Sequence, residues 1–202
     1  DEAGREVPVT PGAKGTLWVQ SNQLLLGYYK RPELNEVVFD KDGFFDTGDI
    51  MIYTSQGDLM FAGRSKETLA LAGGENIEPV PIEDKLLASE FIDQVMVVGD
   101  DKKTLGAIIV PHYDKVRAHT GLKDLPEAEW NSNAKIREVF KEEIGKRISS
   151  KTGFKSFELI PKNTFYISPK PFEAGVELTR TFKLRRTVIK EKFAEQINGM
   201  YN

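Results

Sequence analysis

Two carboxylates bracket a hydroxyl and a glycine in the segment Phe45-Asp46-Thr47-Gly48-Asp49. We predict that Asp49 stands at the end of an apolar strand, where a carboxylate can accept hydrogen bonds from both hydroxyls of a ribose. Gly48 beside it would let a ligand approach the backbone closely. The spacing is more often that of an Asx-type turn, in which an aspartate side chain binds its own backbone.

Two cations are candidates for binding an anion. Arg64, which follows Gly63, can hold phosphate or ribose oxygens through two N–H bonds, although a surface ion pair explains it at least as well. Lys183 lies between two apolar neighbours in the basic segment Leu178–Arg186. A lysine on a loop can neutralise the charge that builds on a phosphoryl group during in-line displacement. The basic end of a solvated helix is the commoner explanation.

A glycine pair opens the segment Gly73-Gly74-Glu75-Asn76-Ile77-Glu78-Pro79 and gives the backbone an unusual path with a polar tip. A plain hairpin turn is the commoner reason for such a pair. Pro79 and Pro81 favour a helix that begins directly after it.

Several other chemistries are excluded by spacing. Asp40–Phe45 resembles a calcium loop, but the ligand and glycine positions that an EF-hand needs hold Phe44, Phe45 and Met51, so a turn is expected. His112 and His119 lie seven residues apart without a third ligand at a suitable spacing. We therefore predict no metal site in this chain. The glycine-rich phosphate loops of nucleotide-binding proteins are also absent.

Composition describes an ordinary globular chain of one or two domains. It has 202 residues, 40% of them hydrophobic and 29% charged, with a net charge of −3. No nucleic-acid partner is expected, because no basic surplus attracts a phosphate backbone. The lack of cysteine fits a reducing compartment, so we expect a cytoplasmic location. No apolar run approaches the roughly 20 residues of a transmembrane segment.

The predicted secondary structure changes along the chain from mostly short strands to a mixture of helices and strands. Residues 1–64 read as short strands at 15–19, 24–28, 44–45, 50–53 and 59–62, joined by turns, with a helical insert that begins at Pro32. A domain boundary is expected after Arg64, in a polar segment led by Gly63. Residues 65–202 read as helices at 81–89, 126–150 and 184–196 and strands at 94–99, 105–111 and 163–167. The predicted fold class is α+β.

Taken in order, these segments resemble the C-terminal part of the acyl-adenylate-forming (AMP-binding) superfamily, and within it the long-chain fatty acyl-CoA synthetases. The resemblance covers almost the whole chain, and the segments that carry it are Gly15–Val19, Gly27–Glu33, Asp42–Asp49, Gly63–Glu67, Gly73–Pro79 with Ile82-Glu83, and Leu178–Arg186. It implies that residues 1–64 are a partial β-barrel segment from the end of a large N-terminal domain. Residues 65–202 would be a small α+β lid domain.

The resemblance also assigns roles to matching residues. Asp49 would bind the ribose hydroxyls, Arg64 the ribose or a nearby phosphate, and Lys66 would be the hinge about which the small domain rotates. Lys183 would contact the acyl carboxylate and the α-phosphate during adenylation. One residue departs from the pattern, because many family members have glycine before this lysine and here Phe182 stands there.

A second loop is implied for the second half-reaction. Gly73, Gly74 and Glu75 would swing in and line the path of the pantetheine arm of CoA. The family's phosphate loop, its adenine-stacking segment, a glutamate that helps to hold magnesium and the acyl tunnel would all lie upstream of Asp1. The chain is therefore expected to be a fragment that is inactive alone.

The implied reaction is that of an AMP-forming long-chain fatty acid-CoA ligase, with ATP, magnesium (Mg2+) and CoA as substrates or cofactors. A fatty acid attacks ATP to give acyl-AMP and pyrophosphate, and the CoA thiol then displaces AMP. Two alternatives stay open, an acyl-acyl carrier protein synthetase and a non-catalytic, lid-like interaction module. Acyl-chain length and oligomeric state are left undetermined, and peripheral membrane association would come from missing residues or from the lipid substrate.

Overall fold

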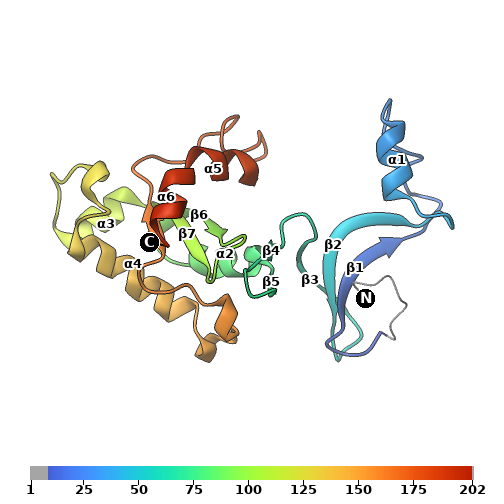
Figure 1. The fold of residues 1–202 in the computed structure, drawn as a ribbon, viewed down its shortest axis with the longest axis horizontal. Helices are drawn as coiled ribbons and strands as arrows, with labels where there is room; N and C mark the ends of the chain where they lie inside the picture. The colour runs from blue at the N-terminus through green and yellow to red at the C-terminus, as the bar shows by residue number, and fades with distance from the viewer. Residues whose placement is uncertain (1–8, 202) are drawn as a thin grey trace. The chain divides into compact units, whose positions relative to one another are not determined.

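The computed structural model describes residues 9–201, which divide into two compact units, Asp1–Thr68 and Leu69–Asn202 (Figure 1). Each unit is described by itself. The domain boundary between residues 64 and 65 stays a prediction.

The first unit is built on a three-stranded antiparallel sheet. Its strands are β1 (Lys14–Val19), β2 (Phe45–Tyr53) and β3 (Leu59–Arg64), in the order β1-β2-β3. The short helix α1 (Pro32–Val38) has proline at its start, as predicted, because the fixed φ of proline suits a first helical turn. Among residues 9–68 these strands form an open sheet and not a closed barrel. The β-barrel segment therefore remains a proposal.

Two strand predictions in this unit were wrong. Residues 24–28 form an irregular loop with bends instead of a strand: Leu26 is fully exposed, Gly27 has φ +148°, and among residues 9–68 no strand pairs with this apolar run. The predicted strands 44–45 and 50–53 are parts of one strand, β2. Asp49 consequently lies in the interior of a strand and not at its end.

The second unit begins with a two-stranded hairpin, β4 (Leu69–Ala70) and β5 (Asn76–Ile77). Its main sheet contains β6 (Ile92–Val98), β7 (Gly106–Pro111) and β8 (Phe165–Ile167), with β6 antiparallel and β8 parallel to β7. The helices are α2 (Pro79–Leu87), α3 (Tyr113–Thr120), α4 (Ala134–Arg147), α5 (Arg186–Lys192) and α6 (Ala194–Gly199). Single 3₁₀ turns occupy residues 127–129, 150–152 and 156–158. The α+β fold class is confirmed.

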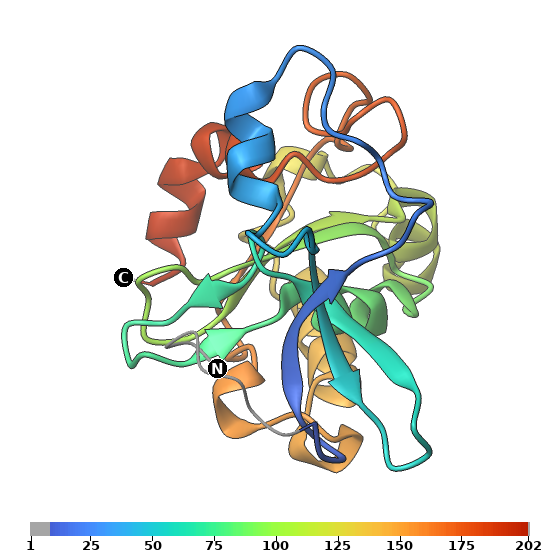
Figure 2. The ribbon, with the colours of Figure 1, turned by 90° about the vertical axis from the view of Figure 1, so that its right-hand side faces the viewer.

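The main sheet is buried on both faces, because alternate residues of its strands point to opposite sides. Val95, Val97 and Ile109 belong to one apolar cluster with residues of α2 and α4. Met96 and Ile108 belong to a second cluster with residues of α5 and of the segment before it. In Figures 1 and 2, α4 (orange) and α5 with α6 (red) accordingly flank the sheet on opposite sides. The unit is thus a helix–sheet–helix sandwich.

Helix boundaries in this unit differ from the predicted ones. The long helix begins at Ala134, where the Asn133 side chain accepts from the Ile136 N–H at 3.1 Å, and not at residue 126. The last predicted helix, 184–196, is two helices separated at Phe193, which has φ −106° and ψ 22°. Helix α3 was not predicted, because only Val116 and Thr120 are buried on it and the apolar pattern is weak. Within residues 9–201 no helix combines the length and the hydropathy required to span a bilayer.

Candidate functional site

The structure brings Asp49 and Arg64 together as directly opposed residues of β2 and β3. The Arg64 Nε lies 3.0 Å from the Asp49 Oδ1, which makes an ion pair. The Arg64 Nη2 donates to the Thr47 carbonyl at 3.0 Å. Both side chains stay accessible, with 34% of Asp49 and 48% of Arg64 exposed.

A bulge in β2 sets this geometry. Thr16 of β1 pairs with Ile50 of β2, and Trp18 of β1 pairs with Asp46 of β2. The one β1 residue between Thr16 and Trp18 is therefore opposite three β2 residues, 47–49. Such extra residues re-aim side chains beside a strand. Gly48 sits in the bulge with φ +68°, a left-handed conformation that favours glycine.

Asp46 forms the turn that the sequence favoured, since its Oδ1 accepts from the Gly48 N–H at 2.8 Å. The surface ion pair considered for Arg64 also forms. These contacts leave Asp49 available, because within residues 9–201 its carboxylate has only Arg64 as a partner. An ionised carboxylate has about four acceptor positions. The Asp49 carboxylate can therefore accept hydrogen bonds from two neighbouring hydroxyls, while the Arg64 guanidinium keeps unused donors for an anion.

Lys66 lies in a turn just after this pair. The turn is closed by Glu67 and Thr68, whose N–H groups donate to the Arg64 carbonyl at 2.9 and 3.2 Å. Lys66 is exposed, and in the described part of the chain its ammonium makes no hydrogen bond or ion pair. It is close to the end of the first unit.

The glycine pair forms the tip of the β4–β5 hairpin, so the hairpin alternative is confirmed. Gly74 has φ +90°, and its N–H donates to the Leu71 carbonyl at 2.9 Å. The Leu71 N–H donates to the Glu75 carbonyl at 3.0 Å and closes the turn. No atom lies within 4 Å of the position that a Gly74 Cβ would take, so the tip is open.

The hairpin rests on the loop between β6 and β7. The Ala72 N–H donates to the Lys102 carbonyl and the Asp101 N–H donates to the Ala70 carbonyl, both at 2.9 Å. Neighbouring backbone thus fixes the base of the hairpin on the main sheet.

Lys183 stands in a tight turn over residues 179–183. The Thr179 N–H donates to the Lys183 carbonyl at 2.8 Å, and the Lys183 N–H donates to the Thr179 hydroxyl at 3.1 Å. Phe182 has φ +61° and is 75% exposed. The Lys183 side chain is exposed and makes no hydrogen bond or ion pair within residues 9–201. The sequence motif therefore presents one unpaired ammonium from an ordered turn.

Hydrogen bonds of Arg185 and the buried Glu177 hold the base of this turn. The Arg185 N–H donates to the Glu177 carbonyl at 2.7 Å, and its Nη1 donates to the carbonyls of Gly175 and Val176 at 3.1 and 2.8 Å. The fully buried Glu177 carboxylate is ion-paired with Lys192 and accepts from the Glu173 N–H at 3.0 Å. Burial opposes ionisation of Glu177, but the Lys192 and backbone hydrogen bonds outweigh it and lower the pKa of this carboxyl.

Glu83 and Arg186 were quoted in the sequence motifs without a role, and the structure joins them. The guanidinium binds both carboxylate oxygens, at 2.8 and 2.6 Å. The signal in the sequence is the position of Glu83 on the apolar face of α2, between the buried Ile82 and Leu86. A carboxylate on an apolar face requires a buried partner.

The predicted residues fall into two groups. Asp49, Arg64 and Lys66 belong to the first unit, and Gly73, Gly74, Glu75 and Lys183 belong to the second. Inside the second unit, no hydrogen bond or ion pair of the described residues joins Lys183 to the glycine hairpin.

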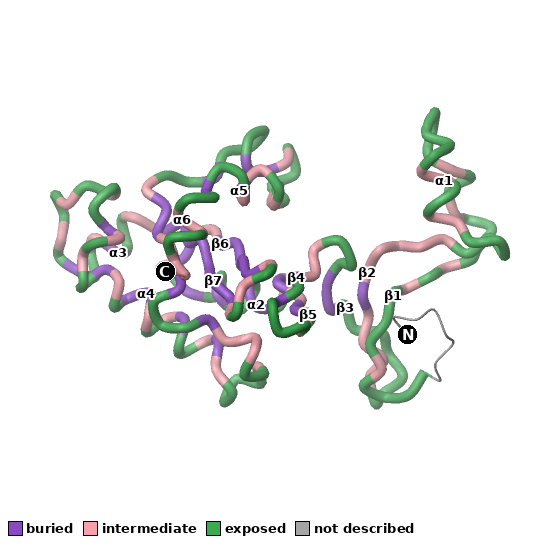
Figure 3. Tube along the Cα trace, viewed as in Figure 1, coloured by how far each residue is buried: buried purple, intermediate pink, exposed green. Residues whose placement is uncertain are grey.

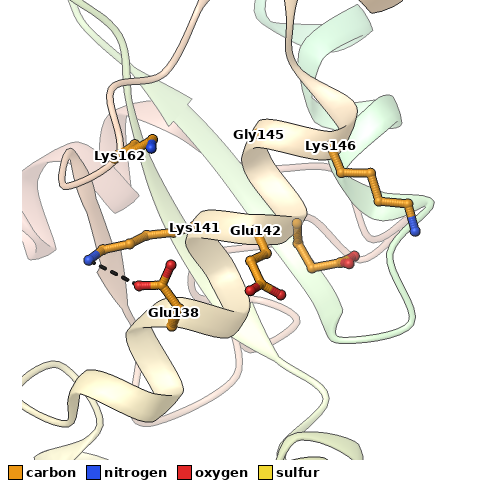
Figure 4. A pocket seen from close by; sticks show the side chains of 7 residues that line it. Glu138, Lys141, Glu142, Gly145, Lys146 and Lys162 are labelled. Carbon is orange, nitrogen blue, oxygen red and sulfur yellow. Dashed lines mark ion pairs between the residues drawn. The ribbon is translucent and has the colours of Figure 1, made fainter.

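A surface pocket of about 450 Å³ lies elsewhere, along α4 (Figure 4). It contains none of the predicted site residues, and its lining is Glu138, Lys141, Glu142, Glu143, Gly145, Lys146 and Lys162. Three carboxylates and three ammonium groups line it together, so it selects neither sign of charge. Within residues 9–201 no group of three or more His, Cys, Asp or Glu side chains is arranged to hold a metal ion.

Comparison with known proteins gives a consistent result. Residues 66–202 match the family model of the AMP-binding enzyme C-terminal domain. The chain is 34% identical over 194 residues to long-chain-fatty-acid–CoA ligase 5 of Mus musculus, covering 93% of this chain and 28% of that protein. It is 32% identical over 203 residues to a chloroplastic long-chain fatty acid–acyl carrier protein ligase of Arabidopsis thaliana, covering 95% of this chain and 26% of the relative.

Among solved structures, the chain resembles the A domain of a carboxylic acid reductase from Segniliparus rugosus, determined in complex with AMP and a co-purified carboxylic acid. The TM-score is 0.81 at 27% sequence identity, over 99% of this chain and 30% of that one. In each of these comparisons the chain spans less than a third of the matched protein.

Proposed function

Because the chain belongs to the family of AMP-binding enzyme C-terminal domains, we propose that it serves as the C-terminal part of an ATP-dependent long-chain fatty acid-CoA ligase. The whole reaction needs more polypeptide than these 202 residues, and the chain by itself is inactive in this proposal. Similarity to ligases that act on long-chain fatty acids supports the substrate class.

The reaction has two steps. In the first, a carboxylate oxygen of the fatty acid bonds to the α-phosphorus of ATP, the bond to the pyrophosphate oxygen breaks, and acyl-AMP forms. In the second, the CoA thiol loses its proton, its sulfur bonds to the acyl carbon and AMP leaves. Charge grows on the phosphoryl oxygens during the first step, so catalysis there depends on positioning and electrostatic stabilisation.

The observation that carries this proposal is the state of Lys183. Its ammonium is exposed and unpaired within the described chain, and it projects from a turn closed by two hydrogen bonds. An ammonium held in this way can meet the acyl carboxylate and the α-phosphate without first breaking an ion pair. We assign Lys183 to the adenylation step.

Asp49 and Arg64 hold the nucleotide in this proposal. The free acceptor capacity of Asp49 suits the two ribose hydroxyls, and the remaining Arg64 donors suit the ribose or a phosphate oxygen. Because the adenosine part of the nucleotide is bound in both steps, Asp49 and Arg64 act in both.

The second step uses the glycine hairpin. The hairpin tip, open at Gly74 and with the Glu75 carboxylate beside Gly73, would line the path of the CoA pantetheine arm. Lys66, in the exposed turn before Leu69, would be the hinge that exchanges Lys183 for this hairpin between the steps.

The described residues offer no ligand set for Mg2+. We therefore treat the cation as part of the Mg-ATP substrate and route no step through residues of this chain.

The test uses the complete ligase that carries this chain, with the two half-reactions measured separately. Lys183→Ala should slow pyrophosphate release from ATP and a long-chain fatty acid by about 100-fold or more, since such electrostatic groups contribute on that scale. Thioester formation from supplied acyl-AMP should stay within about threefold, because charge on the phosphoryl group does not grow in that step. Lys151→Ala removes another exposed lysine and is the matched control. Equal losses in both half-reactions would contradict the role of Lys183.

An acyl carrier protein is the second candidate acceptor, and the similarity to the Arabidopsis thaliana ligase favours it. Thioester formation with CoA and with a phosphopantetheine-bearing carrier protein should be compared in the same enzyme. If the complete protein releases no pyrophosphate with any fatty acid, a non-catalytic lid-like module becomes the better description.

A further inference from the structure

A buried ion pair joins the start of α5 to α2 in the second unit. The Arg186 guanidinium donates from Nη1 to Glu83 Oε1 at 2.8 Å and from Nη2 to Oε2 at 2.6 Å. The side chains are only 13% and 7% exposed. Glu83 Oε1 also accepts from the Val97 N–H of β6 at 2.8 Å. One carboxylate therefore ties helix α5 to helix α2 and to the central sheet.

Arg186 follows the Lys183 turn by three residues, and the backbone between them is constrained. Leu184 packs against the apolar cluster of this sheet face and bridges to Leu178. Arg185 holds the carbonyls of Gly175 and Val176 on the other side of the turn. Since a paired, two-armed guanidinium has a fixed orientation, the Glu83–Arg186 pair anchors the chain three residues after Lys183.

We propose that Arg186, held by Glu83, is a positioning residue that sets the place of the Lys183 ammonium for adenylation. The proposal rests on the proposed function of Lys183. Glu83 and Arg186 act through the turn and contact no reacting atom in this account. Misplacement of a reacting group by about 1 Å is enough to cost roughly 100-fold in rate.

Loss of the Glu83–Arg186 pair should slow adenylation and not thioester formation, because separate hydrogen bonds hold the glycine hairpin. Its base is fixed by the hydrogen bonds of Ala72 and Ala70 with the loop at Asp101 and Lys102. Neither Glu83 nor Arg186 takes part in these bonds. Loosening Arg186 should therefore displace Lys183 and leave the hairpin in place.

The experiment compares Arg186→Lys with Arg147→Lys in the complete ligase. Lysine keeps the charge but cannot bind both carboxylate oxygens in the planar two-armed geometry. Arg147 is the control, because it also forms a largely buried ion pair, with Glu143 at 2.5 Å and side chains 17% and 13% exposed, and it donates to the Ala88 carbonyl just after α2. That pair lies on α4, away from the Lys183 turn.

For Arg186→Lys we expect kcat of adenylation to fall by about 10- to 100-fold, as expected for a displaced reacting group. KM for ATP and the rate of thioester formation from supplied acyl-AMP should change by less than about threefold, because the hairpin keeps its support. Arg147→Lys should leave the ratio of the two half-reactions unchanged. A parallel loss of both half-reactions in Arg186→Lys would overturn the proposal in favour of a general structural role.

A second measurement is independent of activity. In the 202-residue chain, hydrogen exchange at the Phe182 and Lys183 amides should become faster in Arg186→Lys and stay unchanged in Arg147→Lys. Unchanged exchange in both variants would overturn the positioning role. If the wild-type complete protein forms no acyl-AMP while the amides respond as expected, the proposed function fails and the mechanical link stands.

Discussion

The two carboxylates of the Asp46–Asp49 segment make different contacts, although they look equivalent in the sequence. Asp46 binds the Gly48 N–H and maintains the bulge. Asp49 meets only Arg64 within the described residues and has acceptor positions to spare. The turn and the ligand site are therefore both present, on different residues.

This division predicts opposite outcomes for two identical substitutions. Asp49→Asn should weaken ATP use by the complete ligase by about 10- to 100-fold, because a hydrogen bond to a charged group is worth about 1.5–3 kcal/mol. Asp46→Asn keeps an acceptor oxygen for the Gly48 N–H and should change KM for ATP by less than about threefold. Steady-state kinetics with varied ATP check this. Equal sensitivity at both positions would mean that neither carboxylate is a specific ligand.

Phe182 carries backbone strain beside the lysine. Its φ of +61° is a left-handed conformation that favours glycine, because it costs other residues about 1–2 kcal/mol. The 75% exposed ring recovers little of this by packing.

Phe182→Gly should therefore raise the free energy of unfolding by about 0.5–1 kcal/mol. The gain is smaller than the relieved strain, because glycine also increases the entropy of the unfolded state. Phe182→Ala is the control, since it removes the ring and keeps the strain. Urea unfolding of the two variants checks the difference. If alanine gains as much as glycine, the ring and not the backbone is the source of the cost.

At the scale of elements, the buried carboxylate of Glu177 holds the segment 173–192 together. Glu177 has no exposed surface and receives hydrogen bonds from Lys192 and from the Glu173 backbone. Burial raises its pKa, while these donors lower it and prevail, so the folded value lies below the ordinary 4.5. A carboxyl with a lowered pKa adds stability above its unfolded pKa, and this stability is lost as pH falls through the folded value.

Glu177→Gln should then cost about 2 kcal/mol of unfolding free energy at neutral pH, the scale of a hydrogen bond to a charged group, with Lys192 discounted because it is half exposed. The difference from wild type should shrink in acid, as pH falls below the ordinary 4.5 and through the lowered folded pKa, where the wild-type carboxyl takes up its proton. Urea unfolding at neutral pH and in acid measures it. A difference that is constant with pH would place the stabilisation in packing and not in charge.

Elements with a strong local pattern were predicted from the sequence, and those that depend on distant partners were not. The strands β6 and β7 carry the apolar runs Val95–Val98 and Ala107–Val110 and were predicted to within about two residues. The apolar run at 24–28 looks equally strand-like, yet no strand in the described part of the first unit pairs with it. The two strands merged in β2 were separated in the prediction by Gly48, which marks a bulge and not a chain reversal.

The sequence pointed to the single residues of the candidate site but not to the contacts between them. Residue types and order pointed to Asp49, Arg64 and Lys183, but the register that opposes Asp49 with Arg64 arises only when β2 and β3 pair. Glu83 and Arg186 are 103 residues apart. No local pattern in the sequence joins two such positions, so their role became visible only in the packed structure.

At the scale of the whole molecule, the two units differ in how well their apolar residues are covered. In the described part of the first unit the buried hydrophobic residues are Ile50 and Ala62, whereas the second unit holds two extended apolar clusters (Figure 3). The first unit exposes large apolar residues on its strands, its loops and helix α1, among them Trp18, Leu26, Tyr29, Val37, Leu59, Met60 and Phe61. Its outer strands β1 and β3 also have one unpaired edge each among residues 9–68.

This imbalance predicts that the second unit supplies the stability of the 202-residue chain. A small sheet with little buried apolar surface cannot offset the entropy of ordering its backbone. Residues 69–202 expressed alone should unfold cooperatively at nearly the same midpoint as the whole chain. Amides of β1–β3 should exchange with solvent much faster than those of β6 and β7, which open only with the core. Exchange measured at two protein concentrations completes the test, since self-association through the open edges would protect β1–β3 only at the higher concentration. Protection of β1–β3 that equals β6 and β7 at both concentrations would show that the first unit is stable without further polypeptide.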